Sequence, residues 1–294
     1  FFSPCTLLLL CLLFGACNKH EDNSKQIPKG KAVIKVGLHK DAFDGVEILK
    51  KKTANTNKRS ANEPQVQRQT IDISDNWQMT TELIAETSKP ALRKIASTNS
   101  DEVTEISGLN SNIRYNLAVY DKQGSYVTER SYTHGTEGET EDLYLDGGEM
   151  YTFIAYSVNS DSFLPAITFD DPKNKTLSGS TLQVDGSLDL MYYRKDLVVS
   201  GNKENFLGII LKHKLSQITT TINATATNFQ ITNIKASFIP THEELSINLA
   251  NAKITYYTGK KEAAIDFGTS INSTLITSRP TIIAAAENNS TFFN

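Results

Sequence analysis

Residues 150–158, with the sequence MYTFIAYSV, form the segment that most restricts how the chain can fold. In an extended strand, successive side chains point to opposite faces of the sheet. Ile154 and Tyr156 would therefore line one face, and Tyr151 and Phe153 would line the other. Because both faces carry large apolar groups, the segment is predicted to be a central strand of a sheet that is covered on both sides.

The rest of the pattern is a series of short strands separated by polar turns. Residues 113–132 predict a hairpin, in which YNLAVY alternates, DKQG supplies the turn and SYVTERSY returns. Residues 31–39, KAVIKVGLH, also predict a strand. Further strands are expected at residues 142–146, 188–193, 196–200, 205–223, 229–239, 244–251, 253–258, 263–267 and 281–286. A Tyr-Arg-Lys link is expected to separate the strand at residues 188–193 from the one at residues 196–200. Such a series predicts an all-β fold of the sandwich type.

The N-terminal segment has the features of an export signal. Residues 7–14 are all Leu, Cys or Phe, and Gly15, Ala16 and Cys17 follow. A run this short does not span a bilayer, which needs roughly 20 residues, but it has the length of a signal-peptide core. Small residues before a Cys resemble a bacterial lipobox, so we expect cleavage after Ala16 and a lipid on Cys17. An ordinary cleaved signal or a buried apolar helix is the alternative. Without Met or a basic residue before Leu7, the sequence is expected to begin inside the leader.

Cysteine positions and charge narrow the class of protein further. All three cysteines lie in or at the end of the leader, so the exported chain is expected to hold no internal disulfide. The 30 basic and 33 acidic residues give a net charge of −3, which argues against a nucleic-acid partner. No second long apolar run occurs, so a lipid would be the membrane attachment.

Two polar segments flank the first predicted strand. Residues 17–30 predict a flexible tether between the lipid and the folded part. Residues 50–69 contain almost no large apolar side chain and predict a disordered surface loop. Exposed loops of this kind are also where proteases cut, so the second interpretation is a protease-accessible segment with Arg59 or Arg68 at the cleaved bond.

No catalytic or metal-binding constellation is recognisable. None of the five histidines has a second His or Cys at metal-ligand spacing. The HEE sequence at residues 242–244 resembles the start of a zincin motif, but Ser246 stands where the second His is required, and a turn is predicted. His213 is predicted to be a core or an edge histidine and not a site residue, and the carboxylates at residues 139–142 and 170–171 are predicted to lie in solvated loops. We therefore expect no enzyme activity, no metal and no cofactor.

Several blocks of the sequence resemble the fimbrillin family of surface lipoproteins of Gram-negative bacteria. After the lipobox these are IRYNLAVYDKQGSYVTERSYTHG, LDGGEMYTFIAYSVN, DLMYYRKDLVVSG and FLGIILKHKLSQITTTINA, in the family's order and approximate spacing between residues 113 and 224. The resemblance implies two tandem transthyretin-like β-sandwich domains, which we place at residues 31–200 and 201–294, the second expected to be incomplete. It also implies a subunit of a fimbrium on the outer membrane, with other fimbrial subunits as partners and a host or bacterial surface ligand.

The resemblance further implies a route of assembly. Polymerising members are cut after an Arg near the N-terminus, which here would be Arg59 or Arg68. They then release the first strand, residues 31–39 here, and a strand of the next subunit takes its place. An anchor or tip subunit that keeps its lipid is the alternative within the family. A lipid-anchored glycan- or solute-binding β-sandwich is the alternative from a different class, and a concave Tyr and Trp patch near Trp77 together with measurable sugar affinity would favour it. A hydrolase would need two carboxylates facing across a cleft.

Overall fold

A computed structural model describes residues 29–43, 66–74, 77–84, 109, 112–269, 271–286 and 292–293. Within these ranges the regular structure consists of β-strands and two short 3₁₀ turns, η2 Glu137–Glu139 and η3 Thr225–Thr227. The predicted all-β fold is therefore confirmed. In the part of the chain that the structure describes, no helix has the length and apolar character that a membrane crossing requires.

The largest sheet has seven strands in the order β5-β4-β7-β10-β11-β1-β6. Their bounds are β1 Gly30–Phe43, β4 Arg114–Asp121, β5 Tyr126–Thr133, β6 Leu143–Gly147, β7 Met150–Ser157, β10 Met191–Val198 and β11 Glu204–His213. Neighbouring strands are antiparallel except β1 and β11, which run parallel.

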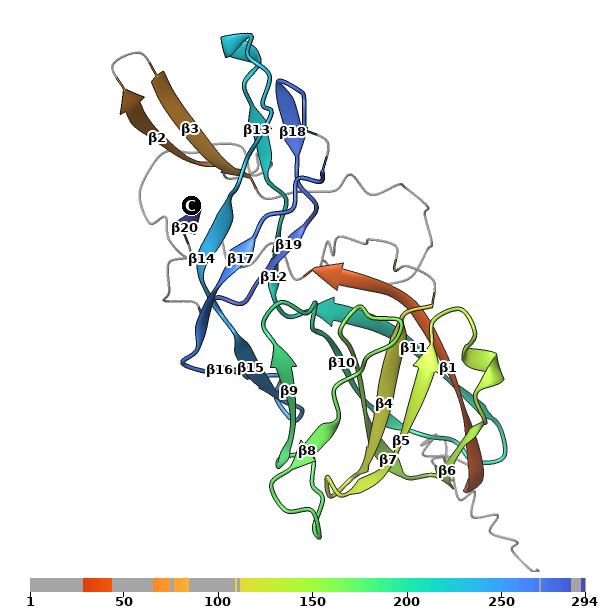
Figure 1. The fold of residues 1–294 in the computed structure, drawn as a ribbon. Helices are drawn as coiled ribbons and strands as arrows, with labels where there is room; N and C mark the ends of the chain where they lie inside the picture. The colour runs from red at the N-terminus through yellow and green to blue at the C-terminus, as the bar shows by residue number, and fades with distance from the viewer. Residues whose placement is uncertain are drawn as a thin grey trace, which may run out of the picture.

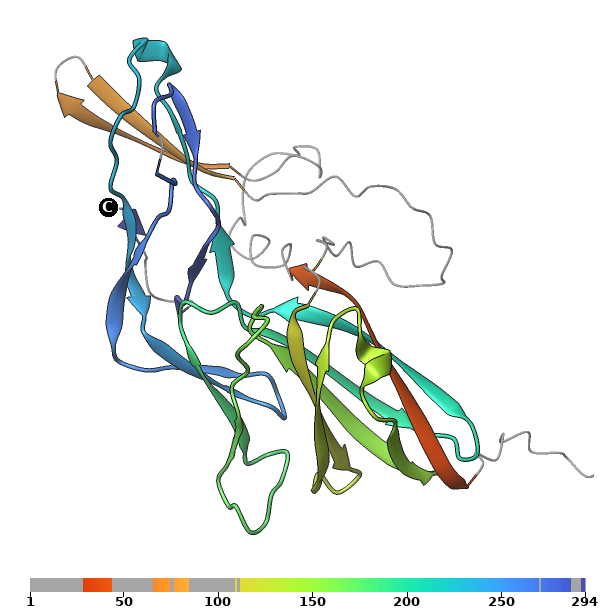
Figure 2. The ribbon, with the colours of Figure 1, turned by 45° about the vertical axis from the view of Figure 1, so that its right-hand side comes forward.

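This sheet folds back on itself between β10 and β11. The two strands share only two paired positions, Met191 with His213 and Tyr192 with Lys212. As a result β11, β1 and β6 form a layer that packs against β4 and β7, and Ile34, Leu207 and Phe153 belong to one buried cluster. Figures 1 and 2 both show β1 running beside β11 on one side of β4 and β7.

A second sheet covers the opposite face of β4, β7 and β10. Its strands are β8 Ile167–Phe169, β9 Ser180–Asp185, β15 Glu244–Asn248 and β16 Ile254–Tyr256, in the order β16-β15-β9-β8. Ile154 and Tyr156 of β7 pack in one cluster with Leu182, Leu245 and Ile247 of this sheet. Seven of the eight residues of β7 are buried, so the prediction of a central strand covered on both sides is confirmed.

The predicted hairpin at residues 113–132 is confirmed as β4 and β5, which pair from Arg114 with Thr133 to Tyr120 with Tyr126. Its turn is closed by the Asp121 carboxylate, which accepts hydrogen bonds from the backbone N–H groups of Gln123 and Ser125 at 2.9 and 2.8 Å. Gly124 takes a φ of 81° in this turn, a conformation that suits glycine because it has no Cβ.

The remaining strands lie beyond one end of these layers (Figures 1 and 2). β14 Ser237–His242 pairs with β17 Lys260–Ala264 and β20 Phe292–Phe293, and Phe238, Ile265 and Ile283 form a smaller core. Two-stranded pairs complete the region: β2 Val66–Ser74 with β3 Trp77–Ile84, β12 Ser216–Ile218 with β19 Thr281–Ile283, and β13 Thr221–Asn223 with β18 Leu275–Thr277.

Four sequence predictions need correction. The strand expected at residues 229–239 is strand only from Ser237, where β14 begins. The Tyr-Arg-Lys link is not a break, because Arg194 and Lys195 pair with Ile154 and Phe153 of β7 inside β10. The strand expected at residues 205–223 is three strands, because β11 ends where the chain leaves the seven-stranded sheet. The loop expected at residues 50–69 includes the start of β2. The domain boundary after residue 200 stays a prediction, and β11 beyond it belongs to the same sheet as β1.

Candidate functional site

Strand β1 is the central strand of its layer. It shares ten register positions with β11 on one side and five with β6 on the other. Ala32, Ile34 and Leu38 point inward and are at most 6% exposed. Lys35 points outward, and its Nζ contacts the Asp142 carboxylate at 2.5 Å. The strand is thus held by backbone pairing on both edges and by apolar packing on one face.

The C-terminal part of β1 is also held by a buried charged cluster. The two ring nitrogens of His213, the last residue of β11, contact Asp189 Oδ1 at 2.6 Å and Asp41 Oδ2 of β1 at 2.9 Å. Asn159 Nδ2 donates a hydrogen bond to the other oxygen of Asp189 at 3.0 Å. The side chains of His213, Asp41 and Asp189 are all buried, with 2–8% of their surface exposed. Of the two predicted positions for His213, in the core or at an edge, the structure shows the core.

The two carboxylates fix the charge of this imidazole. Burial is the largest single influence on the pKa of His213 and lowers it, because burial disfavours the imidazolium. The hydrogen bonds to Asp189 and Asp41 and the charges of both carboxylates act in the opposite direction and together raise the pKa of His213 to about 9. At neutral pH the cluster is therefore one imidazolium between two acidic side chains, and it links β1, β11 and the segment before β10.

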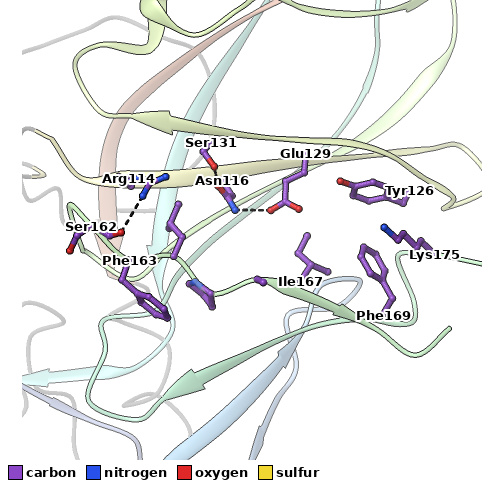
Figure 3. Close-up of a pocket in the computed structure, with 13 residues that line it drawn as sticks. Arg114, Asn116, Tyr126, Glu129, Ser131, Ser162, Phe163, Ile167, Phe169 and Lys175 are labelled. Atoms are coloured by element: carbon purple, nitrogen blue, oxygen red, sulfur yellow. Dashed lines mark hydrogen bonds between the residues drawn. The ribbon is translucent and has the colours of Figure 1, made fainter. Parts of the chain in front are cut away.

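A groove with a volume of about 460 Å³ opens on the other side of β4, beside β5 (Figure 3). One wall is the segment from Ser162 to Phe169, which contributes the apolar side chains of Phe163, Leu164 and Ile167. Phe163 is 52% exposed, so its ring is accessible from solvent. The opposite wall is formed by β4 and β5 and carries polar side chains.

The polar wall is a hydrogen-bonded network across three strands. Asn116 Nδ2 and Tyr156 Oη each donate a hydrogen bond of 2.6 Å to Glu129 Oε1, and Ser131 Oγ donates one of 2.5 Å to Asn116 Oδ1. Asn116 lies directly opposite Ser131 on β5 and Tyr156 on β7, which is why these side chains meet. Asn116 is 8% exposed, and its partners satisfy the polar groups that would otherwise be costly to bury.

Two cationic side chains lie at the ends of the groove. Arg114 Nη1 donates a hydrogen bond of 3.1 Å to the carbonyl oxygen of Ser162, which ties the apolar wall to β4. At the other end Lys175 Nζ lies 5.2 Å from the ring centre of Tyr126 and 5.0 Å from that of Phe169, within the range of cation–π contacts.

Most residues that the sequence singled out for processing lie outside the described residues. This holds for Cys17, Ala16 and Arg59. Arg68 lies in β2, where it pairs with Glu82 of β3, and the two side chains form an ion pair with an N–O distance of 2.5 Å. Its backbone is therefore part of a two-stranded ladder and not of an open loop. Cleavage at Arg59 or Arg68 stays a prediction.

The other polar motifs have structural positions. His242 is the last residue of β14, and its Nδ1 contacts the carbonyl oxygen of Tyr257 at 2.6 Å, while Glu244 begins β15. The HEE sequence is thus a bend between strands, as predicted. Among the described residues, no group of three or more His, Cys, Asp or Glu side chains is arranged to hold a metal ion. The side chain of Trp77 lies outside the described residues, so the presence of an aromatic patch near it stays untested.

The groove was not predicted, although one signal for it was present. Asn116 stands in a strand whose inward positions are otherwise apolar, and a buried polar side chain in such a place indicates a specific partner. The partner residues and the apolar wall could not be inferred, because they come from segments that only the fold brings together.

Comparison with known proteins identifies the family. The profile of the family described as fimbrillin-A associated anchor proteins Mfa1 and Mfa2 matches residues 110–289. A candidate cell adhesion protein of Bacteroides uniformis is similar in structure, with 16% identity, a TM-score of 0.44 and coverage of 62% of this chain and 72% of that one. The fimbrial anchor protein Mfa2 of Porphyromonas gingivalis is similar with 10% identity, a TM-score of 0.39 and coverage of 63% and 69%.

A candidate adhesin of Bacteroides thetaiotaomicron is also similar, with 15% identity, a TM-score of 0.43 and coverage of 62% and 68%. No curated protein matches the chain. The family match extends over more than half of the sequence. The protein therefore belongs to the family of fimbrillin-A associated anchor proteins, and a fimbrial role at the cell surface follows from that membership.

Proposed function

We propose that the protein is the anchor subunit of a fimbrium, held in the outer membrane by a lipid on Cys17, and that it keeps β1 in its fold. The observation that supports this role is the position of β1 between β11 and β6, with its inner face in the main core. An anchor has to transmit force from the filament to the membrane. A central strand joined directly to a lipid tether suits that task.

The packing of β1 supports retention over release. Burying a side chain of the size of Ile34 or Leu38 contributes about 1.5–3 kcal/mol each, and both would be lost with the strand. Loss of β1 would also remove Asp41 from the buried imidazolium of His213. Residues 18–29 between the lipid and β1 can span at most about 40 Å when extended, so the folded part would stay near the membrane surface.

We further propose that the protein assembles with other fimbrial subunits by strand addition. As an anchor, this chain would accept the next subunit without losing β1. In the polymerising alternative, cleavage at Arg59 or Arg68 would release β1, and a partner strand would then occupy the space between β11 and β6. The ladder pairing of Arg68 with β3 speaks against cutting there, because a protease needs an unpaired backbone.

N-terminal mapping by mass spectrometry of the protein from outer-membrane and sheared fimbrial fractions tests the proposal. We expect an acylated Cys17 at the N-terminus in both fractions. A chain that begins at Ser60 or Gln69 in the fimbrial fraction would refute retention of β1. As a matched pair, Cys17→Ala should abolish lipid labelling, while Cys11→Ala, in the leader, should leave it unchanged.

A further inference from the structure

The groove beside β5 presents two chemically different walls to one ligand. Phe163, Leu164 and Ile167 belong to its apolar lining, and Glu129 of β5 and Asn116 of β4 belong to its polar lining. Figure 3 shows Ile167 close to Glu129. Its volume of about 460 Å³ falls within the range of small-molecule binding sites, which is roughly 300–1,000 Å³. A ligand that fills it must offer an apolar surface on one side and hydrogen-bonding groups on the other.

The polar wall is arranged before any ligand arrives. Both hydrogen bonds to Glu129 end on Oε1, and in the part of the chain that the structure describes no hydrogen bond engages Oε2. The carboxylate is thus fixed in orientation and keeps an acceptor for a hydroxyl donor. Groups that are already ordered lose little entropy when they bind, which favours recognition by a small rigid ligand.

The charges around the groove narrow the class of ligand. A wholly apolar molecule would cover the carboxylate of Glu129 without replacing its contact with water, which is unfavourable. An anion would face that carboxylate, and a cation would face Arg114 at one end and Lys175 at the other. A neutral ring with hydroxyl groups avoids all three penalties. The C–H groups of a pyranose can pack on the apolar wall while its hydroxyls donate to Glu129.

We propose that this groove binds the ring of a neutral saccharide, with Phe163 as the apolar contact and Glu129 as the hydroxyl acceptor. The lining carries one carboxylate, whereas glycoside hydrolysis ordinarily uses two, so the site is suited to binding and not to cleavage. This ligand function is separate from anchoring. It would give the subunit an adhesive contact even if the proposals of a lipid on Cys17 and of a retained β1 were refuted.

The test uses the purified chain and four neutral trisaccharides: maltotriose, cellotriose, mannotriose and triacetylchitotriose. Saturation-transfer NMR detects binding, and titration calorimetry measures it. Phe163→Ala removes the apolar contact from an exposed position, and Phe206→Ala, at a residue that is 74% exposed on β11, is its matched control. Glu129→Gln removes the charged acceptor, and Glu149→Gln, at an exposed position outside the groove, is the second control.

We expect at least one trisaccharide to bind, and Phe163→Ala and Glu129→Gln to weaken it by about tenfold or more while both controls leave it unchanged. Because Phe163 is half exposed, the Phe163→Ala variant should fold normally. It therefore keeps the test valid even if the Glu129→Gln variant does not fold. Absence of binding by all four sugars at about 10 mM would overturn the proposal, as would binding that survives Phe163→Ala. Binding of the peptide acetyl-Ala-Val-Ala-Val-Ala-amide and of none of the sugars would show a peptide groove instead.

Discussion

Raising the pH should destabilise this protein through His213. The pKa of this histidine is about 9 in the folded chain, against 6.5 for an ordinary histidine, and its side chain is 2% exposed. A group whose folded pKa is raised contributes its stability below the unfolded pKa and loses it as the pH rises through the folded pKa. The contribution is therefore complete below pH 6.5 and disappears as the pH rises to about 9 and beyond.

The size of the effect follows from the shift. Each pKa unit corresponds to about 1.4 kcal/mol, so the free energy of unfolding should fall by about 3 kcal/mol over this interval. Urea unfolding followed by circular dichroism at several pH values measures it. The series should stop near pH 9, because burial raises the pKa of Tyr120 and Tyr193 to about 12, and buried tyrosines of this kind reduce stability once the pH exceeds about 10.

Two variants separate His213 from other groups. His213→Gln cannot titrate, so its unfolding free energy should be lower at pH 6.5 and nearly flat up to pH 9. His39→Gln, at an exposed position of β1, should keep the slope of the wild-type protein. A wild-type stability that stays constant or increases between pH 6.5 and 9 would show that the imidazolium between Asp41 and Asp189 does not stabilise the fold.

Three substitutions test the packing described above by urea unfolding. Ile34→Ala in β1 should lower the unfolding free energy by about 2–5 kcal/mol. Val33→Ala, on the outer face of the same strand, is the control and should lower it much less. Equal losses would show that the inner face of β1 is not part of the core. Asn116→Ala should cost about 1–3 kcal/mol because it removes one of the two donors to Glu129 and the acceptor of the Ser131 hydroxyl. An unchanged midpoint would contradict that network. Gly186→Ala should cost about 1–3 kcal/mol, because a Cβ would lie 2.0 Å from a β14 carbonyl oxygen, while Gly138→Ala meets no atom within 4 Å and should be neutral.

Local patterns predicted some strands and missed others for a physical reason. β7 was predictable, because alternation with apolar groups on both faces is a property of its own residues. β10 was divided at Arg194 and Lys195, since charged residues usually mark a loop. In the fold their backbones pair with β7 while their side chains reach solvent. Pairing and exposure are set by neighbouring strands, and single-sequence periodicity does not contain that information.

The candidate sites depend even more on long-range geometry. Asp41 and His213 are 172 residues apart, and Asp189 comes from a third segment, so no spacing in the sequence indicated the cluster. The same holds for Glu129 and Phe163, which come from β5 and from the segment before β8. Each residue has an ordinary local context. Their chemistry follows from the way the seven-stranded sheet folds back and from the second sheet that covers it.

Strand β4 couples the two functions proposed for this protein. Its alternate residues Tyr115 and Leu117 pack in the cluster with β1, whereas Asn116 faces the groove and Ala118 faces the second sheet. Because side chains alternate strictly, a shift of one residue in the pairing of β4 would place Asn116 in the core beneath β1 and remove it from the groove. Retention of β1 and ligand recognition would then fail together. Substitutions confined to one face, such as Ile34→Ala or Phe163→Ala, should instead impair one function and leave the other intact.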